Sequence, residues 1–352
     1  MNGGDERDMT AADYPSGGRA TTARSASGNA MRLPLRFAPA FAVTDSETAR
    51  AVHSSHVPRA ALLMVASACC FGSMAIAIRL ASAQLHPFEI AFFRSVFGLL
   101  FTLPLLARAG PQLLRTKRLP LYLFRCVLGT VSMLAAFWAI VNMPMAKAIA
   151  LSYSTPLFVT IGAIFVLGEV VRARRWSAVI AGFIGVLMIV RPGLHGYSPA
   201  ALVALLAALM SACVSICLKF LSRTEAPDTI VIWTTLLWVP LSLPAALLHW
   251  QWPHGETWLF VIAAGFFGTS GHMCWMRALK IGDVSLLAPI SFVQMPIVAV
   301  LAYFMFGESL DRWTVLGAAV IFAANAYITH REARLGRTKM AQARAMAGGA
   351  ES

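Results

Sequence analysis

Charged residues are scarce in this sequence. Only 13% of its 352 residues are Asp, Glu, Lys or Arg, whereas 58% are hydrophobic, and the mean hydropathy is +0.68. Soluble globular domains usually contain about a quarter charged residues, so the composition lies far outside their range. This scarcity of charge excludes an ordinary soluble protein and indicates a protein that resides in a membrane.

Several catalytic and cofactor-binding signatures are also absent. The chain has no HExxH, Walker A or dinucleotide-binding glycine motif, which leaves an ATP-driven machine or an oxidoreductase without support. All six cysteines lie in apolar runs, and Cys213 and Cys217, which share a helix face, have no histidine or third cysteine nearby to complete a metal site. We therefore expect no metal, no cofactor and no enzymatic activity.

One enzyme remains as a remote alternative. Residues 268–271 match the GxSG motif of rhomboid intramembrane proteases, whose serine needs a histidine from another helix. His272 is adjacent in sequence, and it points about 200° around the helix from Ser270. An intramembrane protease is therefore a poor match.

Long apolar runs dominate what is present. Runs of about 20 apolar residues can span the hydrocarbon core as helices. The sequence predicts ten such spans, at residues 60–81, 88–106, 121–141, 147–167, 176–190, 199–221, 229–248, 258–279, 284–306 and 313–329.

The net charge of +13 does not indicate nucleic-acid binding, because the basic residues lie between the spans and in the tails instead of on one face. Alternate loops are rich in Lys and Arg, and the positive-inside rule places these loops and both termini in the cytoplasm of a bacterial inner-membrane protein. The rich loops hold Arg108, Arg115, Lys117, Arg118, Arg172, Arg174, Arg175, Lys219, Arg223, Arg277 and Lys280, and the other loops hold Lys147, Arg191 and Arg312.

The two tails contain no span. Residues 1–57 are rich in Ser, Thr, Gly, Ala and Arg without periodicity, which predicts a disordered cytoplasmic tail, and Met31 is an alternative start. Residues 331–352 form the second predicted tail. Between them we expect two units, residues 58–193 and residues 198–330.

The two units repeat one another. Pro87 and Pro104 recur as Pro227 and Pro244, each 140 residues later, and Arg79 recurs as Lys219. Further along, the offset is 139: Gly129-Thr130 recurs at 268–269, Ser152 at 291 and Gly168-Glu169 at 307–308. Because each unit has five predicted spans, an odd number, the second enters the membrane upside down, and such inverted repeats are typical of transporters.

The motifs also resemble a known family. The segments RCVLGTVSMLAAFWAI and KAIALSYSTPLFVTIGAIFVLGE in the first unit, with GTSGHMCWMRALKIGDVSLLAPISFVQMPIVAVLAYFMFGE in the second, resemble the two EamA repeats of the drug/metabolite transporter superfamily. The resemblance implies an all-α fold of ten transmembrane helices in two inverted five-helix repeats. It also implies a central cavity lined mainly by helices 1, 3, 4, 6, 8 and 9, and transport of small metabolites.

A proline interrupts the fourth span and another the ninth. Proline lacks an N–H and clashes with the carbonyl four residues back, so Pro156 should free the carbonyl of Ser152, and Pro296 that of Phe292. Within a membrane such groups are tolerated where they face protein or a wet cavity. Either the two broken segments form a substrate site near the midplane, or the prolines only kink the helices for packing while nearby hydroxyls bond back to their own helix.

Six residues are candidates for binding substrate. Arg94 lies deep in the second span without a charged repeat partner, which suggests either an ion pair with Glu89 or an anion-binding role at the periplasmic end of the cavity. The aromatic rings could stack on a planar substrate or could simply pack. The candidates are Tyr153, Ser154, Thr155, Gln294, Trp138 and Arg94.

Proton coupling has two candidates, since the middles of the spans contain no Asp or Glu. His272 is the deepest group able to titrate near neutrality, although a lone helix histidine usually serves packing. Glu89, near a helix end, is second. Arg79 and Lys219 lie near helix ends, where long cationic side chains reach the interface.

These observations predict a secondary transporter that exports a small polar or amphipathic metabolite, such as an amino-acid derivative or opine-like compound, across the inner membrane. Import of riboflavin or S-adenosylmethionine is the alternative, and a non-transporting membrane interaction protein is a third, weaker reading. A homodimer is possible, and no nucleic acid is expected as a partner.

Overall fold

The computed structural model describes residues 45–110, 116, 118–167, 173–191, 198–221, 224–281 and 284–348. Met31 and the rest of the tail up to residue 44 lie outside the described residues, as do Gly168, Glu169 and Arg172. The chain divides into two units, residues 1–48 and residues 49–352.

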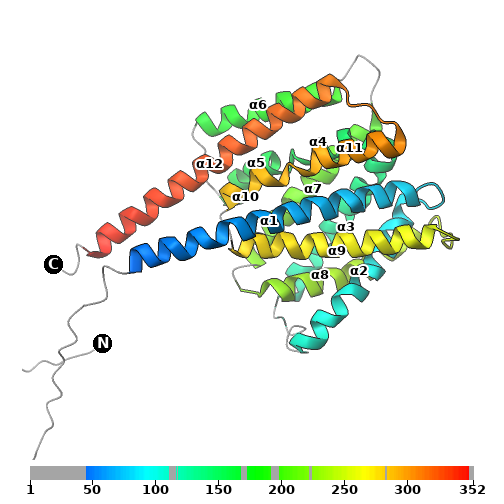
Figure 1. Cartoon of the computed structure of the whole chain (residues 1–352), viewed down its shortest axis with the longest axis horizontal. Helices are drawn as coiled ribbons and strands as arrows, with labels where there is room; N and C mark the ends of the chain where they lie inside the picture. Colours follow the sequence, from blue (N-terminus) through cyan, green and yellow to red (C-terminus); the bar gives the residue numbers. More distant parts are fainter. Residues whose placement is uncertain are drawn as a thin grey trace, which may run out of the picture. The chain divides into compact units, whose positions relative to one another are not determined.

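The described residues form helices and no strands, which confirms the all-α class (Figure 1). The first half holds α1 (Asp45–Ala81), α2 (Pro87–Ala109), α3 (Leu119–Asn142), α4 (Met145–Ser152), α5 (Thr155–Leu167) and α6 (Ala173–Val190). The second half holds α7 (Pro199–Leu221), α8 (Pro227–Leu247), α9 (Thr257–Ile281), α10 (Val284–Ser291), α11 (Gln294–Phe306) and α12 (Arg312–Gly348).

Eight stretches of the described helices are long and apolar enough to cross a membrane. In the second half, each of the five predicted spans overlaps such a stretch. The stretch at 289–306 crosses the break between α10 and α11. In the first half, α6 offers only the shorter apolar helix Trp176–Val190, and the predicted span 147–167 is divided between α4 and α5, of 8 and 13 residues. The count of ten crossings therefore stays a prediction.

Local sequence sets several helix ends. Pro87 occupies the first turn of α2, where its missing N–H costs nothing. A capping box closes this end, because the carboxylate of Glu89 accepts the backbone N–H of His86 at 2.8 Å. The C-terminal end of α11 is capped by Gly307, whose φ of +65° lies in the left-handed region that favours glycine.

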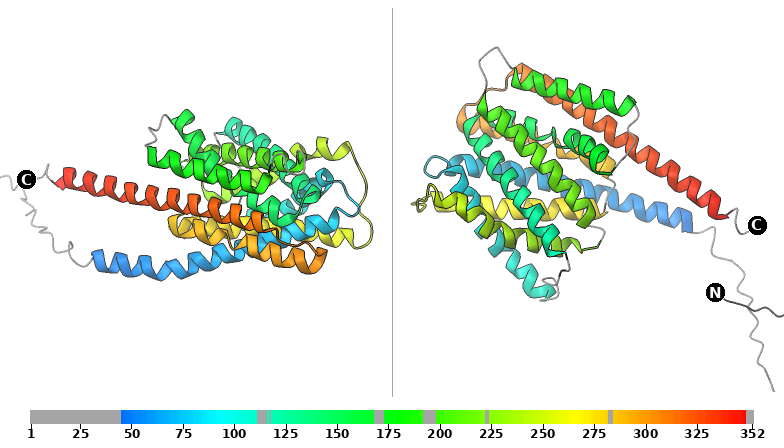
Figure 2. Two further views of the ribbon diagram at one scale, coloured as in Figure 1. Left: turned by 90° about the horizontal axis from the view of Figure 1, so that it is seen from above. Right: turned by 180° about the vertical axis from the view of Figure 1, so that it is seen from behind.

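Helices from the two halves pack against each other. α2 packs against α8 and α9, α3 against α7, α4 against α11, and α6 against α12. Figure 2 shows α6 and α12 side by side from two directions. The pairs α2–α8 and α6–α12 each join helices that correspond in the repeat, so the halves share one interior.

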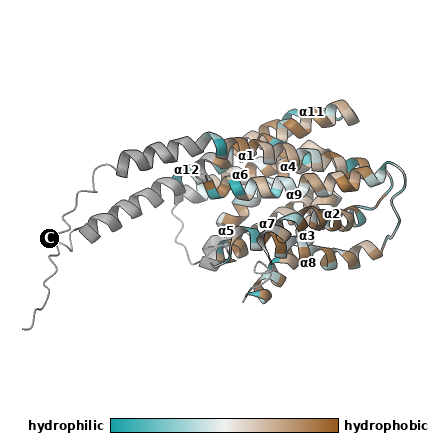
Figure 3. Cartoon of the chain, turned by 60° about the horizontal axis from the view of Figure 1, so that its bottom comes forward, coloured by the Kyte–Doolittle hydropathy of each residue, from teal (hydrophilic) through white to brown (hydrophobic). Residues whose placement is uncertain are grey.

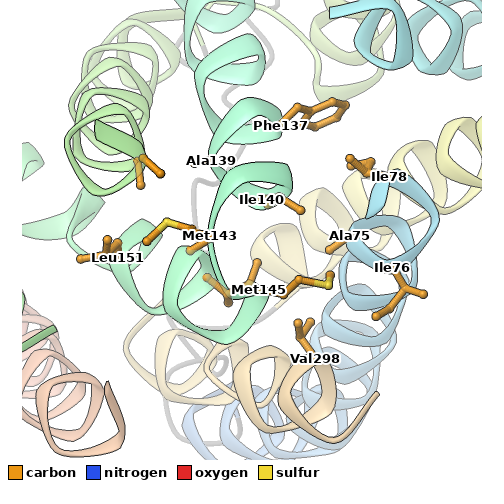
Figure 4. Packing of buried hydrophobic residues seen from close by; sticks show 14 of the residues in the cluster. Ala75, Ile76, Ile78, Phe137, Ala139, Ile140, Met143, Met145, Leu151 and Val298 are labelled. Carbon is orange, nitrogen blue, oxygen red and sulfur yellow. The ribbon is translucent and has the colours of Figure 1, made fainter. Parts of the chain in front are cut away.

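That interior is apolar and contains many small residues. Its largest cluster includes Ile78 of α1, Met145 and Leu151 of α4, and Val298 of α11, all almost completely buried (Figure 4). Large apolar side chains also cover the outer surface, where the described helices appear mostly brown in Figure 3. Apolar residues on both inside and outside are expected where lipid replaces water.

In the second unit, α1 starts and α12 ends at the same end of the helix bundle (Figure 1). We call the opposite end, formed by residues 82–86, 143–144, 248–256 and 307–311, the loop face.

Candidate functional site

The two helix breaks meet in the interior. Tyr153, at the break between α4 and α5, stacks on Phe292, at the break between α10 and α11, with ring centroids 4.0 Å apart and planes at 16°. The two residues are 139 positions apart, so they correspond in the repeat. The Tyr153 hydroxyl also donates a 2.9 Å hydrogen bond to the carbonyl of Ser291. One side chain therefore joins the two broken segments.

At the first break, the freed carbonyl finds a local partner. The hydroxyl of Thr155 donates to the carbonyl of Ser152 at 2.7 Å, in place of the N–H that Pro156 lacks. Ser154 is fully buried, and its hydroxyl donates to the carbonyl of Leu151 at 2.7 Å. In this conformation both hydroxyls bond back to their own chain segment, the arrangement expected of a packed kink.

At the second break, the freed carbonyl also finds a local partner, and the other half supplies a donor to the carbonyl of Ser291. The carbonyl of Phe292, which Pro296 leaves without its helical donor, accepts the N–H of Met295 at 3.0 Å. That N–H would otherwise serve Ser291, whose carbonyl takes the Tyr153 hydroxyl instead. Gln294 is partly buried, and its side chain makes no hydrogen bond within the described part of the chain.

Asn325 of α12 also contacts the first break, and the sequence analysis missed it. Its side-chain N–H donates to the carbonyl of Tyr153 at 2.9 Å, and the residue is almost fully buried. A lone amide side chain in the apolar span 313–329 is the signal that could have revealed it.

Arg94 is buried in α2, with 8% of its surface exposed. Its guanidinium lies over the ring of Trp238 of α8, with the central carbon 5.1 Å from the ring centroid. One terminal N–H donates to the sulfur of Met133 at 3.4 Å, and Nε has no partner among the described residues. Trp138 is partly buried, packs against the main apolar cluster and stays outside these contacts.

Glu89 is fully buried but does not pair with Arg94. Its two carboxylate oxygens accept the backbone N–H groups of His86 and Gln251. Glu89 thus fastens the start of α2 to the segment 248–256 at the loop face.

His272 lies on α9 close to Arg94. Both line a small enclosed space with Thr234, Trp238 and Thr269. The His272 ring centroid is 5.7 Å from that of Trp275, and its ring makes no hydrogen bond to a described residue. The structure therefore groups Arg94 with His272, and it places Tyr153 at the separate junction of the helix breaks.

Arg79 makes contacts that the sequence did not predict. Its guanidinium donates to the carbonyls of Ile140 and Val141 at 2.6 and 2.5 Å, and it pairs with Glu308 at 3.1 Å. The other carboxylate oxygen of Glu308 accepts the N–H of Met145 at 2.8 Å. This pair joins α1, the end of α3, the start of α4 and the end of α11 at the loop face.

Two histidines stack at the same face. His86 and His249 have ring centroids 3.9 Å apart, at 26°. Partial burial, and then the neighbouring His249, lower the pKa of His86, while Glu89 opposes this. Nδ1 of His86 accepts the N–H of Phe88 at 3.4 Å, which requires an unprotonated nitrogen.

A larger cavity lies elsewhere. A space of about 250 Å³ at the loop face is lined by Lys147 of α4, Thr314 of α12, and Arg191 and Asp311, which lie just outside α6 and α12. Arg191 and Asp311 form an ion pair there, and Arg191 lies over Trp313. None of the predicted substrate residues lines this cavity. Among the described residues, no group of three His, Cys, Asp or Glu could hold a metal ion.

The fold and its two joined repeats define a membrane transporter. A family model described as the EamA-like transporter family matches residues 58–191 and again residues 198–329. The chain therefore belongs to the EamA-like transporter family, within the drug/metabolite transporters, and transports small metabolites.

The chain is similar to several bacterial transporters. An S-adenosylmethionine uptake transporter of Rickettsia prowazekii is 30% identical, over 71% of this chain and 85% of the relative. A riboflavin transporter of Vibrio cholerae is 31% identical, over 80% and 96%. A pseudopaline exporter of Pseudomonas aeruginosa is 30% identical, over 75% and 93%. One solved crystal structure, 21% identical, shares the fold with a TM-score of 0.58 over 79% of this chain and 99% of that chain.

Proposed function

We propose that this chain is a secondary transporter that moves a small polar or amphipathic metabolite across a bacterial inner membrane by alternating access. The observation that carries the proposal is the junction of the two broken helices, where Tyr153 stacks on its repeat counterpart Phe292. Transporters of inverted-repeat design bind substrate where such discontinuous helices meet near the midplane.

In this mechanism the two repeats rock against each other around the junction. The Arg79–Glu308 pair joins helices of both repeats at the loop face, and in this mechanism it separates when that face opens. Tyr153, Ser154, Thr155, Gln294 and Trp138 line the substrate path, and the hydroxyls now bonded to the backbone exchange those bonds for substrate. Pro156 and Pro296 keep the breaks deformable, because no helical hydrogen bond has to be broken there.

The direction we propose is export of an amino-acid derivative or opine-like compound, supported by the likeness to the pseudopaline exporter. Uptake of S-adenosylmethionine or riboflavin is the second candidate, and the likeness to the two transporters of those compounds favours it. His272 is the proposed proton-coupling group, with Glu89 second.

The test is a metabolite profile of cells with and without the gene, measured inside the cells and in the medium. Export predicts one compound that accumulates inside the deleted strain, and uptake predicts one that stays in its medium. Complementation with Tyr153→Phe or Gln294→Leu should change the rate per molecule of protein in the membrane. A profile that does not respond to the gene under any growth condition, with the protein present, would overturn the proposal.

A further inference from the structure

Two arginines are buried between α2, α3, α8 and α9, and neither has a carboxylate partner among the residues that the structure describes. Arg94 is 8% exposed and Arg125 is 3% exposed. Neither forms an ion pair within the described part of the chain, and Nε of each has no hydrogen-bond partner there. Because a guanidinium stays protonated in proteins, burying it without an anion carries a large free-energy cost.

The acceptors these arginines do have are weak or already engaged. Arg94 donates to a thioether sulfur, which is a weak acceptor. Arg125 donates to the hydroxyl of Thr234 at 2.5 Å, and that hydroxyl donates onward to the carbonyl of Ile230. The indole N–H groups of Trp233 and Trp238 are also buried, with no acceptor in the described part of the chain. This part of the interior therefore has an excess of donors and positive charge, which an anion would satisfy.

Gly268 of α9 lies against the guanidinium of Arg94. A Cβ added at Gly268 would lie 2.8 Å from the terminal nitrogen Nη2 and 2.9 Å from Nε of Arg94. Arg94 and Gly268 both line a small enclosed space, together with Thr234, Trp238, Thr269 and His272. A guanidinium N–H can donate a charge-assisted hydrogen bond to a carboxylate oxygen in such a space.

We infer that this space receives an oxygen of the carboxylate of the transported metabolite, bound by the guanidinium of Arg94, with Arg125 behind Thr234 adding a second positive charge. The inference rests on the proposed function and narrows its substrates to those with a carboxylate. The space now admits about one water-sized group. A carboxylate oxygen has this size, so the acidic end enters while the rest of the molecule lies toward the centre.

The carboxylate subsite is tested by thermal unfolding of the purified full-length protein with sodium acetate as the probe. Acetate should raise the unfolding temperature by more than sodium chloride does at equal ionic strength. Arg94→Gln should shift the acetate midpoint about tenfold or more to higher concentration. Arg59→Gln, which removes an exposed arginine of α1, is the matched control and should leave the acetate response unchanged.

A second variant covers the case in which Arg94→Gln fails to fold. Gly268→Ala keeps the charge of Arg94 but places a methyl group 2.8 Å from its Nη2 and 2.9 Å from its Nε, where it crowds the guanidinium beside the enclosed space, and alanine suits a helix better than glycine. It should also abolish the acetate response. Equal stabilisation by acetate and chloride in the wild-type protein would overturn the inference, as would an acetate response that survives in Gly268→Ala.

Acetate binding requires no transport, so this experiment separates the two proposals. An acetate-specific response in a protein that alters no metabolite level would overturn the proposed function alone. Altered metabolite levels without an acetate-specific response would overturn the carboxylate subsite alone.

Discussion

At the scale of single residues, the Tyr153 hydroxyl serves as the hydrogen-bond donor that α10 and α11 lack at their break. Tyr153→Phe keeps the ring and its stacking on Phe292 but leaves the carbonyl of Ser291 without its 2.9 Å donor. A hydrogen bond of this kind contributes about 0.5–1.5 kcal/mol to stability. We expect the free energy of unfolding in detergent to fall by about this amount, measured by denaturant titration.

The matched control is Tyr303→Phe on α11, because that ring lies on the outer surface and is 59% exposed. The free energy of unfolding of Tyr303→Phe should stay close to that of the wild type. If the two variants are equally stable, the bond between Tyr153 and Ser291 contributes nothing to joining the repeats.

The His86–His249 pair predicts a pH dependence. The pKa of His86 lies below the ordinary value of 6.5, so the folded protein binds fewer protons there than the unfolded chain. The contribution of His86 to the free energy of unfolding should therefore be fully present above about pH 6.5. It should be lost as the pH drops from that value toward the pKa of His86 in the folded protein. His249→Phe keeps an aromatic neighbour and removes the second cause of the shift, so the loss between about pH 7 and pH 5 should shrink.

The measurement is the unfolding temperature across that pH range for the wild type and the variant. His254→Phe, a histidine outside the stacked pair, serves as the control. An acid-side loss of the same size in the wild type and in His249→Phe would remove the stacked pair as its source.

The sequence predicts the local chemistry of individual residues but not most of the residues that they contact. The carbonyl freed by Pro156 and the burial of Arg94 follow from proline geometry and from position within a span. The hydrogen bond from Thr155 to the carbonyl of Ser152 is also local, and it is the kind of bond that the packing interpretation of the prolines predicts. The partners of Arg79 and Tyr153 come from more than 60 and 130 positions away in the chain, so they depend on helix packing that a single sequence does not display.

At the scale of helices, Arg79 and Glu308 link four segments at the loop face. Their side chains are 24% and 16% exposed, so solvent screens the pair only in part. A double-mutant cycle with Arg79→Gln and Glu308→Gln separates their mutual attraction from the backbone contacts each also makes. We expect a coupling free energy of about 0.5–3 kcal/mol in unfolding measurements. Additive effects of the two substitutions would show that the pair does not hold this face.

The contact of α6 with α12 depends on glycine. A Cβ at Gly185 would lie 2.7 Å from the backbone oxygen of Gly317, and neither backbone can yield without separating the helices. Gly185→Ala should therefore lower stability by about 1–3 kcal/mol. The control is Gly162→Ala, whose Cβ would meet only the flexible end of Ile216. The unfolding temperature of Gly162→Ala should stay near that of the wild type. Equal losses of stability in the two variants would show that close backbone packing at Gly185 is not the cause.

At the scale of the whole molecule, composition and the repeat predicted the class of fold. The apolar helix Trp176–Val190 coincides with the predicted fifth span. The span predicted at 147–167 divides into α4 and α5, because apolar length reports how far a segment can reach and not whether its helix is continuous. Which helices pack together could not be predicted. The lipid-facing and buried faces of a helix are equally apolar, so the hydrophobic pattern does not show which face contacts protein.

The orientation of the molecule is a prediction that charge and repeat make together. Five crossings per repeat invert the second half, and the basic loops place the end opposite the loop face in the cytoplasm. Reporter fusions after positions 115, 172, 223 and 280 should report cytoplasm, and fusions after 195 and 254 should report periplasm. Positions 195 and 254 flank α7 and α8, so they must share a side if each helix crosses once. A cytoplasmic signal at 254 with a periplasmic one at 195 would break that count, and with it the inversion on which alternating access depends.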